Sequence, residues 1–240
     1  MTDSSSEDAK AEHGARHIAA DRKKAAKATD TPPQPSQRRQ NKRREQQRSI
    51  DTRRAILSAA LDEFSERGFD GASIRRIGER AKLDFTLITY HFSNKDVLWR
   101  AVAEWGLGEI LDAVVPRDSL LTAKERVRVE FLAYFNFTTA NPAFHNFMLR
   151  SMYGDPERIR WLVENYLVRI RDRLRPQLAE AQAAGEMVSG DPDLLYYLMI
   201  GATSALSSLR GEMELTTGYA LEDPKVRAAF WDLIERSFFR

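Results

Sequence analysis

Four residue pairs that each place an Asp or Asn before a proline constrain the fold of this sequence more than any other feature. They are Asn141-Pro142, Asp155-Pro156, Asp191-Pro192 and Asp223-Pro224. The Asp or Asn side chain can cap a helix N-terminus, and proline is tolerated at the first helical position because its missing N–H is not needed there. The pairs therefore predict four helices, over about residues 142–153, 156–184, 192–210 and 224–239. We expect Gly185 and Gly211 to stop two of them and Pro176 to kink or break the longest.

Apolar side chains before residue 141 also recur with helical spacing. For example, Ile56, Ala60 and Phe64 lie four residues apart, and Gly68 is expected to end their helix. Similar stripes and caps, including a capping box at Thr122–Glu125, predict helices that begin near residues 50, 73, 84, 95 and 122. The sequence shows no alternating strand pattern of useful length and no internal repeat. We therefore predict an all-α fold.

The composition excludes several classes of protein. About 42% hydrophobic and 30% charged residues are typical of a globular chain. No apolar run approaches the ~20 residues that cross a bilayer, and the N-terminus is polar, so we expect neither a membrane span nor a signal peptide. The absence of cysteine excludes a disulfide framework and thiolate-bound zinc, and it is compatible with a reducing cytosol.

The positive charge is concentrated in residues 38–50, which carry six basic side chains and one acidic side chain. This segment has a net charge of +5, whereas the rest of the chain sums to −3. Residues 1–46 contain almost no large apolar side chains, so we expect them to form a disordered basic extension. Arg43, Arg44 and Arg48 are the candidate phosphate contacts of this arm. A solvated extension without a specific partner is the alternative.

The two short predicted helices over about 73–81 and 84–92 are joined by a tight turn, as in a helix-turn-helix unit. The second helix of such a unit lies in the DNA major groove. If Ile88 and Phe92 face the core, the remaining side chains are left to face DNA: Phe85, Thr86, Leu87, Thr89, Tyr90 and His91. The polar members would donate to phosphates or bases, and the two apolar members would pack against thymine methyl groups. An ordinary helical hairpin with a polar surface is the alternative.

One lysine extends this candidate DNA surface. Lys95 stands at the predicted start of the next helix, where free backbone amides already favour an anion. The lysine would add a positive charge beside those amides. We therefore predict that Lys95 contacts a DNA phosphate.

Over roughly Thr52–Trp105 the chain resembles the TetR-type transcriptional regulators. The resemblance is carried by RRAILSAALDEFSERGFDGASIRRIGERA and YHFSNKDVL. It implies a helix-turn-helix DNA-binding domain over residues 47–97 and a helical domain over 98–240 that dimerises and holds an inducer. It also implies a repressor of a prokaryotic cytoplasm, associated with the nucleoid. DNA-facing positions implied by the resemblance are Ser73, Phe85, Thr86, Leu87, Tyr90, His91 and Lys95.

Three residues depart from the pattern of that family. Lys82 stands where Gly is usual, Thr89 where Tyr is frequent, and Gly78 where Ala is usual. Lys82 either adopts an unusual backbone conformation or marks a different turn, and it is a further candidate phosphate contact. The Phe-Thr-Leu sequence at 85–87 predicts a distinct operator sequence.

The second half of the chain is rich in aromatic residues and methionine but has no convergent set of reactive groups. It contains no Gly-rich phosphate loop, nucleophile elbow or metal-ligand cluster, so we predict no enzyme activity, cofactor or metal. Such side chains form either an ordinary core or a pocket for a small hydrophobic or aromatic ligand. The candidate ligand-binding residues are Phe131, Tyr134, Phe135, Phe147, Met148, Met152, Trp161 and Tyr166. Candidate polar anchors are Asn136, His145, Asn146 and Arg150, although His145 also fits a core or surface position.

The last two predicted helices combine large apolar residues with small ones that allow close approach. We predict that they form a homodimer through Leu198, Ala202, Ala205, Leu209, Phe230, Leu233 and Phe238. A two-fold dimer requires a near-palindromic operator on double-stranded DNA. Closure of the monomer's own core is the alternative. Two further hypotheses are a DNA-binding dimer without an inducer and an all-α enzyme or lipid carrier with a vestigial helix-turn-helix.

Overall fold

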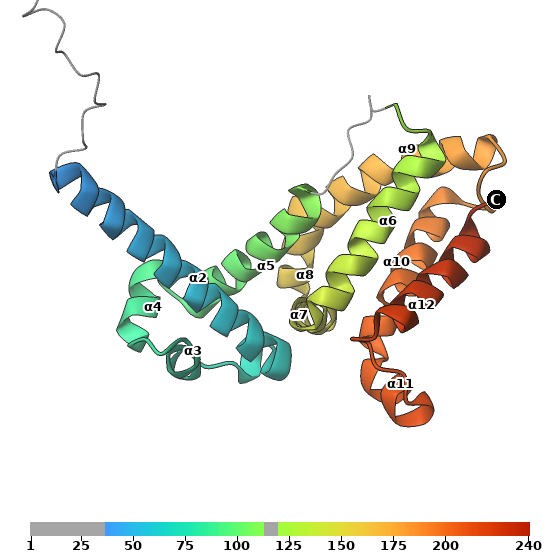
Figure 1. Cartoon of the computed structure of the whole chain (residues 1–240). Helices are drawn as coiled ribbons and strands as arrows, with labels where there is room; N and C mark the ends of the chain where they lie inside the picture. Colours follow the sequence, from blue (N-terminus) through green and yellow to red (C-terminus); the bar gives the residue numbers. More distant parts are fainter. Residues whose placement is uncertain (1–36, 113–119) are drawn as a thin grey trace, which may run out of the picture. The chain divides into compact units, whose positions relative to one another are not determined.

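The computed structural model of the protein describes residues 37–112 and 120–240, and these residues are mostly helical (Figure 1). The chain divides into two units, Met1–Arg48 and Ser49–Arg240. Within the described ranges, extended backbone pairs only in an isolated antiparallel bridge between Met187 and Phe239. None of the helices in these ranges combines the length and apolar character needed to cross a bilayer. The all-α prediction is confirmed.

The helical elements follow one another along the chain with short connections. They are α2 (Gln37–Gly71), α3 (Ile74–Ala81), α4 (Phe85–Phe92), α5 (Lys95–Asp112), α6 (Ala123–Ala140), α7 (Pro142–Met152), α8 (Pro156–Leu162), the π-helix η1 (Val163–Leu167), α9 (Val168–Ala183), α10 (Pro192–Ser208), α11 (Arg210–Thr217) and α12 (Pro224–Phe238).

Helix α2 begins earlier than the sequence analysis expected. Residues 37–46, which were assigned to the disordered extension, are helical, whereas residues 1–36 lie outside the described part of the chain. The segment 37–67 contains neither Gly nor Pro and is rich in Arg, Gln and Glu, which are good helix formers. The helical geometry is interrupted at Gly68, which has φ 68° and ψ 179°, so the predicted break at this glycine is correct.

Helix α3 is anchored to α2 by the buried carboxylate of Glu63. Its Oε1 accepts hydrogen bonds from Arg76 Nε at 2.6 Å and from the backbone N–H of Ser73 at 3.2 Å, while Oε2 accepts from Arg80 Nε at 3.2 Å. Ser73 is the N-cap of α3, so its amide is one of those that a helix leaves unpaired. One buried carboxylate therefore accepts the first amide of α3 and forms ion pairs with two of its arginines.

The α3–α4 turn depends on two residues that depart from the family pattern. Lys82 has φ 55° and ψ 40°, so this lysine adopts the left-handed conformation in which glycine is favoured. A Cβ atom at Gly78 would lie 2.9 Å from the carbonyl oxygen of Leu83, which is closer than side chains normally approach backbone. The glycine at 78 thus lets the start of α4 pack tightly onto α3.

Two predicted boundaries in the second half are wrong. Helix α9 continues through Pro176, and the departure from α-helical geometry occurs earlier, in the π-helix η1. Gly211 lies inside α11 instead of ending α10, and Gly218, in the left-handed conformation, ends α11. Gly185 does follow the end of α9 with φ 74°, as expected.

The unit Ser49–Arg240 contains two hydrophobic clusters. The first joins the helix-turn-helix region to α5 and α7 through residues such as Phe64, Trp99 and Phe147. The second lies between α6, α9, α10 and α12, and the first three of these helices pack against one another (Figure 1). Helix α5 takes part in the first cluster and then reaches α6. Residues of both clusters, such as Leu107 and Leu174, line one cavity.

Candidate functional site: a DNA surface and an interior cavity

The predicted DNA-facing side chains gather on α4 and on the turn before it. Ile88 and Phe92 are buried, as the sequence analysis assumed. Tyr90 is 82% exposed, Phe85 is 43% exposed, and Leu87 and His91 are half-buried. Thr86, Thr89 and Lys82 are exposed, and Ser73 is half-buried at the start of α3. We call these outward residues of α3, α4 and their turn the α3–α4 surface.

Two threonines of the α3–α4 surface already use their hydroxyl protons within the chain. Thr86 Oγ1 donates to the N-cap carboxylate of Asp84 at 2.5 Å, and Thr89 Oγ1 donates to the Thr86 carbonyl oxygen at 2.8 Å. The hydroxyl and amide of Thr86 hold the pKa of Asp84 below its usual range, so Asp84 is charged at neutral pH. Both threonines are therefore better placed to accept hydrogen bonds from DNA bases than to donate to phosphates. Tyr90 keeps a free donor within the described chain.

The structure gives Lys95 a role different from the predicted phosphate contact. Its ammonium donates to the carbonyl oxygens of Phe69 at 2.8 Å and Ala72 at 3.2 Å, and the Asp70 carbonyl oxygen lies 3.5 Å away. The same ammonium lies 4.5 Å from the centroid of the Phe69 ring. Two of these carbonyls lie in the last turn of α2 and the third follows it, where helical carbonyl groups lose their partners. Lys95 therefore fixes α5 to this connection.

One arginine of the α3–α4 surface was missed by the sequence analysis. Arg75 is exposed on α3, and its guanidinium lies 5.6 Å from the centroid of the Phe85 ring. Arg76 and Arg80 are engaged by acidic side chains of α2, whereas Arg75 makes no hydrogen bond within the described residues. The sequence signal was the pair of adjacent arginines in α3, of which only one can face α2. Arg75 therefore adds a positive charge beside α4.

The arginines of the basic segment are helical and exposed. Arg43, Arg44 and Arg48 lie in the part of α2 that belongs to the first unit. Their predicted contacts with phosphates stay a prediction.

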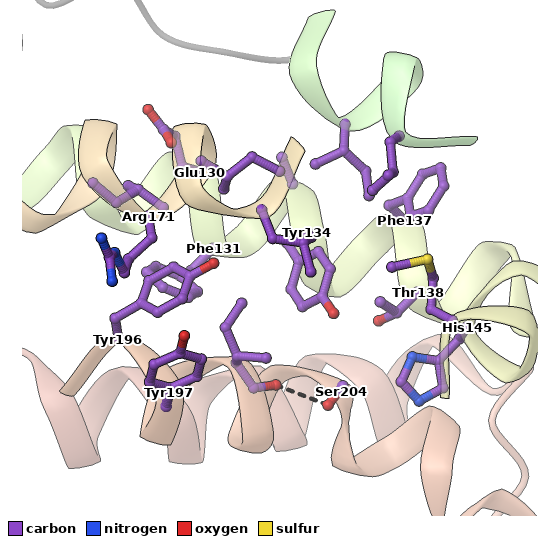
Figure 2. A pocket seen from close by; sticks show the side chains of 18 of the residues that line it. Glu130, Phe131, Tyr134, Phe137, Thr138, His145, Arg171, Tyr196, Tyr197 and Ser204 are labelled. Atoms are coloured by element: carbon purple, nitrogen blue, oxygen red, sulfur yellow. Dashed lines mark hydrogen bonds between the residues drawn. The ribbon is translucent and has the colours of Figure 1, made fainter. Parts of the chain in front are cut away.

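A cavity of about 600 Å³ lies between helices of the second half (Figure 2). This volume is within the range of small-molecule binding sites. Its walls are mostly apolar and are formed by Leu107, Ile110, Glu130, Phe131, Ala133, Tyr134, Phe137, Thr138, Phe144, His145, Met148, Leu149, Met152, Val163, Leu167, Val168, Ile170, Arg171, Arg173, Leu174, Tyr196, Tyr197, Ile200 and Ser204.

Half of the predicted ligand-binding residues line this cavity: Phe131, Tyr134, Met148 and Met152. The other four pack elsewhere. Phe135 stacks on Phe230 and contacts Trp231, and Phe147 lies between Phe64 and Trp99. Trp161 contacts Trp99, Tyr166 and the guanidinium of Arg100. Of the candidate polar anchors, His145 lines the cavity, whereas Asn136, Asn146 and Arg150 do not.

The cavity has two different polar ends. Glu130 and Thr138 are eight residues apart on α6, which is about 12 Å along a helix, and Tyr196 and Ser204 have the same spacing on α10. Figure 2 shows Glu130 and Tyr196 on one side of the cavity and Thr138 and Ser204 on the other. We call the part around Glu130, Arg171, Arg173 and Tyr196 the charged end, and the part around Thr138, His145 and Ser204 the neutral end.

At the charged end, acidic and basic side chains are paired. Glu130 is 8% exposed, and its Oε2 accepts a hydrogen bond from Arg173 at 2.8 Å. Burial raises the pKa of Glu130, and the nearby Arg173 opposes this effect. Arg171 donates to Asp172 at 2.6 Å. Sequence reasoning missed these residues because charged residues on a helix usually face solvent.

At the neutral end, hydroxyl protons are donated to backbone carbonyls. Thr138 Oγ1 donates to the carbonyls of Phe135 at 3.1 Å and Thr203 at 3.4 Å, and Ser204 Oγ donates to Ile200 at 2.8 Å. A hydroxyl has one proton, so these oxygens keep only acceptor capacity. The neutral end therefore presents acceptors to the cavity.

His145 belongs to the same hydrogen-bonded group. Its Nε2 lies 2.7 Å from Ser208 Oγ, and that hydroxyl donates to the Ser204 carbonyl at 3.0 Å. We assign the serine proton to this carbonyl, and the assignment makes Nε2 the donor and leaves Nδ1 as an acceptor. Burial lowers the pKa of His145, so the ring is neutral at pH 7.

The cavity and the helix-turn-helix region share helix α7 as a common wall. His145, Met148 and Met152 face the cavity, whereas Arg150 Nε donates to the Ser65 carbonyl of α2 at 2.7 Å. Phe144, also on the cavity wall, packs directly against Gly106 of α5, where a Cβ atom would overlap its ring. A movement of α7 would therefore change its contacts with both α2 and α5.

The predicted dimer residues divide into exposed and buried groups. Leu198, Leu209 and Leu233 are 60%, 54% and 56% exposed on α10, its C-cap and α12. Ala202, Ala205 and Phe230 are half-buried, and Phe238 is buried in the second cluster.

The described residues contain no group of His, Asp or Glu side chains that could hold a metal ion.

The comparisons with known proteins agree with this arrangement. Residues 56–102 match the family model described as bacterial regulatory proteins, tetR family. The HTH-type transcriptional repressor Rv1474c of Mycobacterium tuberculosis (strain ATCC 25618 / H37Rv) is 30% identical over 191 residues, which cover 78% of this chain and 93% of that protein. The HTH-type transcriptional regulator RutR of Escherichia coli (strain K12) is 29% identical over 179 residues, or 71% and 81% of the two chains.

Solved structures show the same fold. The TetR family transcriptional regulator PfmR from Thermus thermophilus superposes with a TM-score of 0.58 at 21% identity, covering 77% of this chain and 99% of that chain. The chain belongs to the TetR family of transcriptional regulators, and it is a regulator and not an enzyme.

Proposed function

We propose that this protein is a cytoplasmic repressor that binds a near-palindromic operator as a homodimer and leaves it when a small hydrophobic molecule enters the cavity. In this proposal residues 47–97 bind DNA, and residues 98–240 bind the ligand and dimerise. The observation that carries it is the mainly apolar cavity of about 600 Å³ whose wall, α7, is also hydrogen-bonded to the DNA-binding half through Arg150 and Ser65.

The proposed DNA contacts come from the α3–α4 surface. Tyr90 and Arg75 supply donors for phosphates, and Phe85 supplies an exposed apolar face for a thymine methyl group. Lys95 acts by positioning α5 against the α2–α3 connection. The basic segment around Arg44 adds attraction that does not depend on sequence.

The proposed dimer forms through α10 and α12. Leu198 and Leu233 expose apolar area that a soluble monomer would not usually present on adjacent helices. Pairing of these two helices with their symmetry copies would bury that area in a four-helix bundle.

The proposed regulation follows from the position of α7. A ligand that needs more space between α6 and α7 would bind best to a form in which Phe144 and Arg150 have shifted. That form would release Ser65 or press on Gly106 of α5, and so change the placement of α4. A ligand can shift the equilibrium only by its difference in affinity for the two forms.

Selection of bound DNA from a random library at stated salt tests the DNA-binding part. We expect a two-fold symmetric sequence to be enriched. Tyr90→Ala and Arg75→Ala should each lower affinity for that sequence about tenfold, by removing a phosphate contact. Tyr153→Ala is the matched control, because Tyr153 is 89% exposed but lies at the end of α7. If no sequence is enriched, or if the three variants lose the same affinity, the proposal fails.

A cavity-filling variant tests the regulatory part. Ala133 lines the cavity, so Ala133→Trp should occupy much of the space that a ligand needs. We expect this variant to retain operator binding but to stop responding to any compound that releases the wild-type protein from DNA.

Sedimentation tests the dimer. It should show a dimer for the wild type and a monomer for Leu198→Asp combined with Leu233→Asp. A wild-type monomer at micromolar concentration, with or without DNA, would contradict the dimer.

A further inference from the structure

We propose that the ligand of the cavity is an uncharged molecule with an apolar body and a hydroxyl or N–H group, which it places at the neutral end. This inference rests on the proposed function, since it names the chemical class of the inducer. The cavity itself would accept many apolar molecules. The hydrogen bonds that its polar residues already make limit which chemical class of ligand can bind.

The neutral end favours a ligand that donates a proton. Thr138 and Ser204 have already given their hydroxyl protons to backbone carbonyls, and Nε2 of His145 gives its proton to Ser208. Each of these side chains keeps an acceptor lone pair. A ligand hydroxyl or N–H can therefore bind without breaking any hydrogen bond of the protein, whereas a ligand carbonyl would find few protons.

Tyr134 makes a hydroxyl the best match among such donors. Its phenol points toward the neutral end in Figure 2, and it has no hydrogen-bond partner within the described chain. Burial raises the pKa of Tyr134 to about 12, so the phenol is protonated and can donate. One ligand hydroxyl could accept from Tyr134 and donate to Thr138, His145 or Ser204.

The charged end argues against an anionic ligand. Both cavity-lining arginines are in ion pairs, Arg173 with Glu130 and Arg171 with Asp172. Oε1 of Glu130 and Nε of Arg173 are both buried and have no partner among the described residues, so this end offers one acceptor and one donor side by side. A carboxylate or phosphate bound to that Nε would lie beside the negatively charged Glu130 carboxylate, which would repel it. An uncharged ligand that carries a second donor could bind Oε1 of Glu130 without this repulsion.

Three probes of nearly equal shape separate these possibilities: 4-hexylphenol, 4-hexylanisole and 4-hexylbenzoate. The phenol both donates and accepts, the anisole only accepts, and the benzoate is an anion at pH 7.5. Titration calorimetry with the full-length protein measures the Kd of each. We expect the phenol to bind about tenfold more tightly than the anisole or the benzoate, as a protein acceptor left unpaired weakens binding. Equal affinities for phenol and anisole, tighter binding of the benzoate, or no binding by any probe would overturn the inference.

Variants at the neutral end locate the donor. Thr138→Val has nearly the same shape as the wild type, and His145→Phe removes the ring acceptor. Each should weaken the phenol about fivefold to tenfold and leave the anisole within twofold. Met148→Leu, which changes an apolar wall residue, should alter both probes by the same factor. If Thr138→Val and His145→Phe also change both probes by one factor, the donor does not lie at the neutral end and the inference is wrong.

The same probes distinguish failure of this inference from failure of the proposed function. Operator release is measured for each probe by fluorescence anisotropy of labelled DNA. If the anisole or the benzoate binds best and releases DNA, the chemical class is wrong but the ligand-controlled repressor stands. If a probe binds in the cavity without affecting DNA at saturation, the proposed regulation is wrong while the preference for a donor can still hold.

Discussion

The α3–α4 surface and the cavity are assembled in opposite ways. The surface is built from about twenty consecutive residues, Ser73 to Tyr90, on two short helices and one turn. The cavity draws its walls from α5, α6, α7, η1, α9 and α10, which are spread over about a hundred residues. Local chemistry therefore determines the first, and long-range packing determines the second. One chain can therefore contain a site whose residues are adjacent in the sequence and a site whose residues come together only through tertiary contacts.

Gly106 of α5 packs against Phe144 in the cavity wall, and it gives the largest expected effect. Gly106→Ala would force the buried ring of Phe144 away from α5, and we expect the free energy of unfolding to fall by about 3 kcal/mol. Gly108→Ala is the control on the same helix, since a Cβ there meets nothing, and it should stabilise by about 0.5–1 kcal/mol. Denaturant titration measures both. Equal effects would show that α5 and α7 are not tightly packed at this point.

Lys95 tests whether a residue next to the α3–α4 surface acts on DNA or on the fold. Lys95→Met keeps the apolar stem but removes the ammonium that donates to the Phe69 and Ala72 carbonyls. We expect the free energy of unfolding to fall by about 2 kcal/mol, because these are hydrogen bonds from a charged donor. If operator affinity fell while stability stayed unchanged, Lys95 would instead contact DNA directly, as the sequence predicted.

Lys82 separates backbone conformation from DNA contact at the α3–α4 turn. Because φ is positive at this position, Lys82→Gly should be more stable than Lys82→Ala by about 1 kcal/mol. If the lysine contacts a phosphate, both variants should reduce the salt dependence of DNA binding by the same slope, of about one. If the salt dependence of DNA binding were the same in both variants as in the wild type, Lys82 would not contact a phosphate.

His145 gives the smallest effect, on the cavity side. Burial lowers the pKa of this histidine below the usual 6.5, so the unfolded chain binds its proton first as the pH falls. The stability contributed by the neutral ring is complete above about pH 6.5 and is lost as the pH falls through the folded-state pKa. His145→Gln should therefore lose less stability than the wild type between pH 8 and pH 5, by chemical denaturation. Parallel pH profiles would show that the ring is not held neutral.

Much of the fold could be predicted because its signals are local. The Asp-Pro and Asn-Pro pairs mark the starts of α7, α8, α10 and α12 as the sequence predicted. The three Asp side chains cap their helices, whereas the Asn141 side chain does not cap α7 and donates instead to the Phe137 carbonyl. Capping and proline geometry depend only on neighbouring residues. The break expected at Pro176 did not occur. Helix α9 packs against α6 and α10, and these contacts can hold it in a helical conformation through a proline. The chain departs from the α-helix instead at η1, for which the sequence carries no such marker.

The residues that line the cavity could be predicted only in part from the sequence. Aromatic residues such as Phe131 and Phe135 have the same pattern along α6, yet only Phe131 lines the cavity, while Phe135 packs against α12. Glu130 was not predicted at all, because its burial depends on Arg173 from a helix more than forty residues away.

Periodicity and short motifs were enough to predict the helical class, the family and the exposed position of residues such as Tyr90. The hydrogen bonds from Lys95 to backbone carbonyls, the position of Arg75 beside Phe85, and the acceptors of Thr138 and His145 at the cavity could be seen only in the tertiary structure. A hydrogen bond or ion pair between distant segments occupies a donor proton or a charged group, which is then not available to a ligand or to DNA. The chemistry left for a ligand or for DNA can be known only after those internal partners are known.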